Sequence, residues 1–144
     1  MHDEPITLLV VEDNDLDVEN IHRIFSKLGI KHPIVRAKDG VEGLSLLKSG
    51  AGNQGTKGRR AVLLDLNMPR MNGFEFLGEV RKDPAISHTP VFVMTTSDRP
   101  KDIHAAYQFN IAGYLVKSFS RDQMIAAVSA LNAFWNICEF PNAQ

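Results

Sequence analysis

Short apolar runs recur along this chain, and polar residues follow each of them. The runs are Ile6–Val11, Ile34–Ala37, Ala61–Leu64, Val91–Met94 and Tyr114–Val116. Each is too short for an ordinary helix and carries few polar positions, which is typical of strands buried on both faces of a parallel sheet. The pattern therefore predicts five strands.

Apolar residues at helical spacing fill the intervals between these runs. In the first interval, Val18, Ile21, Phe25 and Leu28 predict a helix that Gly29 ends. The later stripes are Val41, Leu44 and Leu47; Phe74, Leu77 and Val80; Ile103, Ala106 and Tyr107; and Met124, Val128, Leu131, Trp135 and Cys138. The fourth helix has few substantial apolar contacts, so we expect it to open more easily than its neighbours.

Five alternating strand and helix units predict an α/β fold, with a five-stranded parallel sheet and helices on both faces. The chain has 144 residues and 44% hydrophobic content, so we expect residues 1–144 to form one domain. The Gly-rich stretch Ser49–Arg60 lacks the Gly-Lys-Ser/Thr of a nucleotide-binding loop, which favours a surface loop. This architecture serves several functions, so the polar residues must distinguish them.

The charge and the ends of the chain indicate an ordinary environment. A formal charge of -1 gives no field for binding nucleic acid or membranes, and no apolar run approaches the roughly 20 residues of a membrane span. Cys138 is the only cysteine, and Met1–Pro5 lacks the basic and apolar regions of a secretory signal. We therefore expect a cytoplasmic protein.

The polar residues at the ends of four predicted strands should meet at one edge of the sheet. They are Glu12 and Asp13, Asp65, Thr95 with Thr96, and Lys117. Ligands bind at the carboxyl edge of open parallel sheets. Three carboxylates, a hydroxyl and an ammonium are therefore expected to form one site.

The residue types in this site suit phosphoryl transfer to Asp65. Glu12, Asp13 and Asp65 offer the oxygen ligands that Mg²⁺ prefers. Lys117 can offset negative charge on a phosphoryl group, and Thr95 can donate a hydrogen bond to it. The alternative is that Asp65 caps a helix and that the acidic pair favours a helix N-terminus, but this leaves Thr95 and Lys117 unexplained.

At these residues the chain resembles the receiver domain of two-component response regulators, from about Ile6 to Ala133. The matching positions are Glu12 and Asp13, Asp65 within LLDLNMPRMNG, Thr95, Tyr114 and Lys117. The runs DLNMPRMNG and VFVMTTS and the final FW pair are similar to the stand-alone regulators of phytochrome-type histidine kinases. Receivers commonly carry proline after the lysine, whereas Ser118 follows here.

The resemblance implies a flavodoxin-like (βα)5 receiver fold and a specific mechanism. A histidine kinase of the phytochrome type would phosphorylate Asp65, with Mg²⁺ held by Glu12, Asp13, Asp65 and the backbone carbonyl of Asn67. Thr95 would move toward the phosphoryl group and Tyr114 would turn inward. The face made by the fourth helix, fifth strand and fifth helix would then change its binding preference. The protein would be a phosphoacceptor that assists its own phosphorylation and dephosphorylation rather than an enzyme. Family geometry also favours a cis Lys117–Ser118 bond, and no output domain is expected.

Three other classes of function compete with this interpretation. An aspartyl-phosphate hydrolase would be expected to carry a second acid two residues after its nucleophile, where Asn67 stands. A flavin carrier would need a phosphate-cradling first loop, but the acidic group from Glu12 to Asp15 repels phosphate. An interaction module with a vestigial site would bind partners without phosphorylation.

The last helix carries a second apolar line, which predicts a homodimer. Ala127, Ala130, Phe134 and Ile137 form this line, and Phe140 lies beyond the expected helix end, in a C-terminal extension covering about residues 134–144. A symmetric dimer would bury Phe134, Ile137 and Phe140. The alternative is that Phe134 and Phe140 fold back as a local cap.

Overall fold

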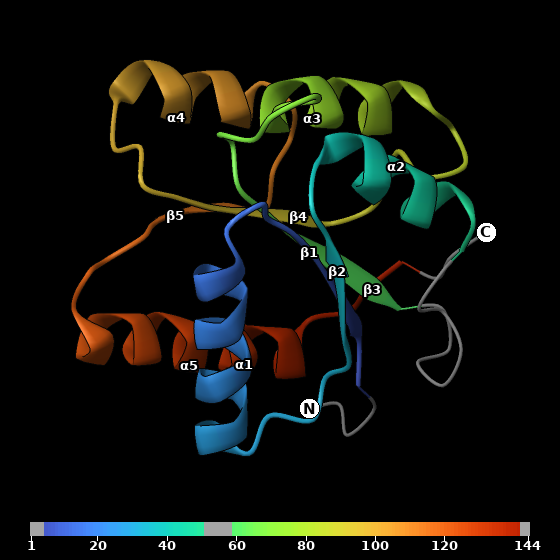
Figure 1. Ribbon diagram of the computed structural model, residues 1–144. Helices are drawn as coiled ribbons and strands as arrows, with labels where there is room; N and C mark the ends of the chain where they lie inside the picture. The colour runs from blue at the N-terminus through green and yellow to red at the C-terminus, as the bar shows by residue number, and fades with distance from the viewer. Residues whose placement is uncertain (1–4, 51–58, 142–144) are drawn as a thin grey trace.

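A parallel sheet of five strands, in the order β2-β1-β3-β4-β5, forms the middle layer of this computed structural model, which describes residues 5–50 and 59–141 (Figure 1). The strands are β1 (Thr7–Val11), β2 (Ile34–Ala37), β3 (Arg60–Leu64), β4 (Val91–Thr95) and β5 (Gly113–Val116). All four neighbouring pairs are parallel. The predicted α/β fold is confirmed.

Helices cover both faces of the sheet. Figure 1 shows α1 (Asp15–Leu28) and α5 (Arg121–Ile137) on one face, and α2 (Gly40–Lys48), α3 (Gly73–Lys82) and α4 (Pro100–Tyr107) on the other. Because successive strand residues point to opposite faces, β1 contributes to two separate cores. Leu8 and Val10 belong to the core beneath α1 and α5, whereas Leu9 and Val11 belong to the opposite core.

Several details of the elements differ from the predicted pattern. The strand β3 begins at Arg60, which is 8% exposed and donates a hydrogen bond from a guanidinium nitrogen to the Leu47 carbonyl at 3.1 Å. In α3 the buried aromatic residue is Phe76, while Phe74 is half-buried. Ala106 is the one buried residue of α4, consistent with its sparse apolar stripe. Residues 51–58 of the predicted surface loop lie outside the described residues.

The loop after β3 is folded tightly against the start of α3. Asn72 and Glu75 form a capping box there. The Gly73 N–H donates to the Leu66 carbonyl at 3.0 Å, and a Cβ added at Gly73 would lie 2.7 Å from the Asp65 carbonyl oxygen. Only glycine fits at this position without a backbone shift, so the first turn of α3 fixes the loop that carries Asp65.

The Lys117–Ser118 bond is trans, so the expected cis geometry is wrong. A cis bond before a residue other than proline costs about 3 kcal/mol. With the trans bond, the Ser118 N–H donates to Met124 Sδ at 3.4 Å and the Ser118 hydroxyl donates to Gln123 Oε1 at 2.5 Å. These contacts attach the loop to the first turn of α5.

Candidate functional site

Asp65 lies immediately after β3, at the carboxyl edge of the sheet. Its backbone N–H donates to the Val11 carbonyl at 3.0 Å, which continues the pairing of β3 with β1 by one residue. One carboxylate oxygen accepts a hydrogen bond from the Asn67 N–H at 3.4 Å. The residue is 8% exposed, so its carboxylate lies at the base of the site rather than on the open surface.

Glu12, Asp13 and Asp65 meet as the sequence predicts. One carboxylate oxygen from each lies within 4.8 Å of the others. Glu12 is buried and Asp13 is exposed, so the cluster has an inner and an outer side. All three donors are oxygens, which fits a hard divalent cation, and such a cation would offset the mutual repulsion of the three carboxylates.

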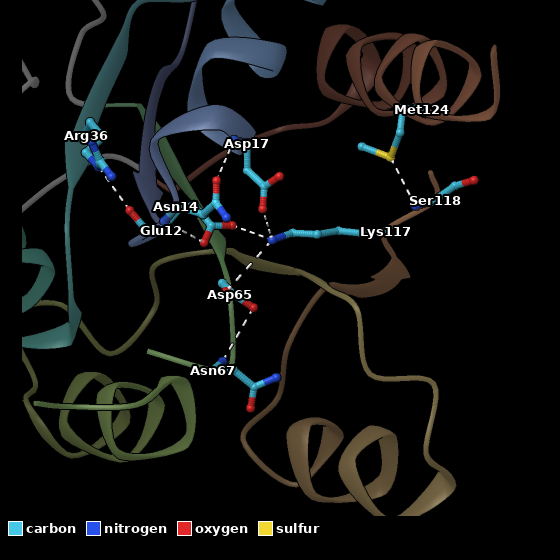
Figure 2. Close-up of polar contacts among 9 residues, drawn as sticks. All are labelled: Glu12, Asn14, Asp17, Arg36, Asp65, Asn67, Lys117, Ser118 and Met124. Atoms are coloured by element: carbon cyan, nitrogen blue, oxygen red, sulfur yellow. Dashed lines mark hydrogen bonds and ion pairs between the residues drawn. The ribbon is translucent and has the colours of Figure 1, made fainter. Parts of the chain in front are cut away.

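Lys117 extends from the end of β5 into this acidic cluster (Figure 2). Its Nζ lies 2.5 Å from Glu12 Oε1 and 3.9 Å from Asp65 Oδ2. A third carboxylate, from Asp17 in the first turn of α1, lies 2.8 Å from the same nitrogen. The Lys117 ammonium therefore lies between carboxylates from the end of β1, the first turn of α1 and the end of β3.

The pKa values of Glu12 and Lys117 reflect their burial and their mutual attraction. Burial raises the pKa of Glu12 to about 7, Lys117 opposes that rise, and Asp65 adds to it. Burial alone would lower the pKa of Lys117, but hydrogen bonds to Asp17 and Glu12 raise it above its ordinary value. The Lys117 side chain therefore carries a firmly held positive charge inside the site.

Thr95 and Tyr114 lie at the neighbouring strand ends. Thr95 ends β4 with 0% exposure, and its hydroxyl oxygen Oγ1 is buried without a hydrogen-bond partner among the described residues. Tyr114 is half-buried, and its hydroxyl donates to the Ser97 carbonyl at 2.9 Å. A buried polar group without a partner is uncommon, and a hydroxyl free to donate here suits an incoming anion.

Two residues that shape the site were missed by the sequence reasoning. Asp17 was not assigned a role, although it contacts Lys117 directly. Arg36 in β2 donates from Nε to the Glu12 carbonyl at 2.9 Å and pairs with Asp15 at 2.9 Å. Neither has a local sequence signal, because an acid in the first turn of a helix and a charge in an edge strand are ordinary features.

The residues predicted for a dimer interface lie at the end of α5. Phe134 is 46% exposed and packs edge-on against Phe92, with ring centroids 6.1 Å apart. Ile137, the last residue of α5, is 65% exposed. Phe140 follows the helix and packs partly against the core beneath α1 and α5. Phe134 and Ile137 therefore form most of the exposed apolar surface here.

The chain matches the response regulator receiver domain family over residues 8–129. It is 30% identical to the response regulator Rcp1 of Synechocystis sp. over 131 residues, which cover 91% of this chain and 89% of Rcp1. Within the described residues, no helix is both long and apolar enough to cross a bilayer.

Solved structures show the same fold. The Mn²⁺-bound form of Rcp1 has a TM-score of 0.81 and 29% identity, covering 95% of this chain and 99% of that one. The phosphorylated cyanobacterial phytochrome response regulator RcpA has a TM-score of 0.81 and 29% identity, covering 96% and 99%. Response regulator RPA3017, from red light signaling of R. palustris, has a TM-score of 0.82 and 31% identity, covering 95% and 99%. The family model covers most of the chain and the relatives share its fold, so this chain belongs to the response regulator receiver domain family.

Proposed function

We propose that this chain accepts a phosphoryl group on Asp65 and signals by contacts that depend on that group. An Asp65 carboxylate oxygen would form the new bond to phosphorus while the P–N bond of a kinase phosphohistidine breaks, leaving its electron pair on the imidazole. The observation that carries this proposal is the convergence of three groups at one edge of the sheet. They are Asp65, the Lys117 ammonium and the Thr95 hydroxyl, which has no hydrogen-bond partner in the part of the chain that the structure describes. Such an arrangement positions the reactants and stabilises phosphoryl charge.

The cation we propose is Mg²⁺, held by Glu12, Asp13, Asp65 and the backbone carbonyl of Asn67. The all-oxygen donor set and its negative charge support a hard cation. The cation would reduce the repulsion between the carboxylates and the incoming phosphoryl group. The Rcp1 structure contains Mn²⁺, which uses the same class of oxygen ligands.

Thr95 and Tyr114 are the proposed switch residues. A phosphoryl group on Asp65 would attract the Thr95 hydroxyl, and Tyr114 is connected to the same loop through its hydrogen bond to Ser97. The face made by α4, β5 and α5 already presents apolar side chains, since Tyr107 of α4 and Val116 of β5 are 48% and 46% exposed. We propose that this face changes its binding preference on phosphorylation.

A phytochrome-type histidine kinase is the partner we propose. Support comes from the likeness to RcpA and RPA3017, whose structures concern phytochrome and red light signaling. Incubation with a set of phosphorylated histidine kinases should give the fastest transfer from a phytochrome-type member.

The proposed function is tested without a kinase by incubating the protein with Mg²⁺ and phosphoramidate. The intact mass should rise by one phosphoryl group, because the site itself supplies the positioning and charge stabilisation that transfer needs. Failure to gain that mass at saturating donor, with the protein folded by circular dichroism, would contradict the proposal.

A homodimer through the end of α5 is also proposed. Phe134→Asp should lower the mass seen by light scattering to that of a monomer, since a symmetric interface loses the same contact twice and gains two buried charges. Ser129→Asp is the control, because it adds the same charge at an exposed position on another side of α5. A monomeric unmodified protein at tens of micromolar, with and without beryllofluoride as phosphoryl mimic, would rule the dimer out.

A further inference from the structure

We propose that Asp17 is a positioning residue that, together with Glu12, holds the Lys117 ammonium in place for phosphoryl transfer to Asp65. Asp17 Oδ2 lies 2.8 Å from Lys117 Nζ, although the two residues are 100 positions apart in the chain. This inference rests on the proposed function and adds a residue to its site.

The partial burial of Asp17 and Lys117 separates this contact from an ordinary surface ion pair. Its side chain is 36% exposed, against 81% for Asp15 in the same turn of α1, and the Lys117 side chain is 13% exposed. Exposed ion pairs contribute little, but a charge-assisted hydrogen bond that is partly shielded from water fixes its partner more firmly. Asp17 therefore does more than complement the dipole of α1.

The two acids that hold the ammonium are themselves connected through Asn14. The Asn14 N–H donates to Glu12 Oε2 at 3.3 Å, and the Asn14 side-chain oxygen accepts from the Asp17 N–H at 3.1 Å (Figure 2). Asn14 is also the N-cap of α1, so the start of that helix sets the position of Asp17. The residue that caps α1 therefore also helps to place Lys117, through Asp17.

The number of donors on the ammonium indicates what this placement achieves. A lysine ammonium has three N–H groups, and Glu12 and Asp17 accept two of them. Asp65 Oδ2 lies 3.9 Å from the same nitrogen, so a phosphoryl group on that oxygen would lie within reach of the remaining N–H. A donor fixed before the reaction stabilises developing charge without reorganising during transfer.

Asp17 is not one of the three clustered carboxylates Glu12, Asp13 and Asp65. Its loss should therefore slow transfer without changing how the cation binds. We expect Asp17→Asn to lower the transfer rate constant from phosphoramidate at saturating Mg²⁺ about tenfold, because small misplacements of a catalytic group cost that much or more. The Mg²⁺ concentration for half-maximal rate should stay within about threefold.

The test is a double-mutant cycle with Lys117→Ala, which removes the group that Asp17 positions. Asp17→Asn should have no further effect on the transfer rate in the Lys117→Ala background. With Lys117 intact, Asp17→Glu should recover part of the rate that Asp17→Asn loses. Glu19→Gln is the matched control, since it removes the same charge from the same helix at an exposed residue that pairs with Arg23 at 3.8 Å.

A rate within twofold of the unmodified protein for Asp17→Asn, a faster rate, or the same tenfold loss in the Lys117→Ala background would each overturn the inference. If the unmodified protein itself takes no phosphoryl group in this assay, the proposed function fails instead. The two failures are therefore distinguishable in one experiment.

Discussion

Asp65→Asn should abolish phosphorylation, with incorporation from phosphoramidate or from a phosphorylated kinase reduced at least about 1000-fold. An amide oxygen is a poor nucleophile, and the two other carboxylates beside the Lys117 ammonium, those of Glu12 and Asp17, already accept its hydrogen bonds. The measurement is the fraction of protein that gains one phosphoryl group by intact mass. Labelling that persists in the variant would show that another residue is the acceptor.

The fold should survive this substitution. Asn has the same shape as Asp, and replacing one of three clustered carboxylates removes like-charge repulsion, so the melting temperature should not fall. Asp98→Asn provides the control, because it makes the same change at an exposed residue. Asp98 lies at the same carboxyl edge of the sheet, in the loop after β4. That variant should be phosphorylated like the unmodified protein.

Removal of the cation should have the second-largest effect. A dianionic phosphoryl group cannot approach three carboxylates unless their charge is offset, so EDTA should suppress transfer almost completely. Asp13→Asn should weaken Mg²⁺ binding by about 100-fold or more, since loss of a partner outside the ligand shell already costs roughly 10- to 100-fold. The transfer rate as a function of Mg²⁺ concentration measures the dependence on the cation and the weaker Mg²⁺ binding of the Asp13→Asn variant.

Excess Mg²⁺ should restore transfer in the Asp13→Asn variant, because Asp65 and Lys117 remain in place. It should restore nothing in Asp65→Asn. Transfer at an undiminished rate in EDTA would contradict a cation-dependent site.

The strands could be predicted from sequence because a sheet covered by helices on both faces leaves few polar positions in its strands. Val62 and Val93 are fully buried, as their apolar runs indicate. The boundaries were less predictable, because a residue such as Arg60 is buried through a hydrogen bond to the Leu47 carbonyl, which no local pattern signals. Phe76 was missed because Phe74 stands three residues before Leu77 and so fits a helical stripe, whereas Phe76 directly precedes Leu77.

The site residues at the strand ends could be predicted for a geometric reason. Parallel strands place their carboxyl ends together, so Asp65, Thr95 and Lys117 had to meet whatever their separation in sequence. Asp17 was unpredictable because it lies on a helix, where the rotation of the first turn decides whether it faces Lys117 or water. The Lys117–Ser118 bond is trans because a cis bond is costly before a residue other than proline, and the family pattern of a proline after the lysine does not apply here.

The position of the phosphoryl group along the chain decides whether Asp65 is the acceptor. Borohydride reduces an acyl phosphate to an alcohol, so phosphorylated protein treated with it and then digested should contain homoserine at position 65 in the peptide that carries LNMPRMNG. We expect this change only at Asp65, and only when Mg²⁺ was present during phosphorylation. Reduction at Glu12, Asp13 or Asp17, or a phosphoryl group that resists borohydride, would contradict it.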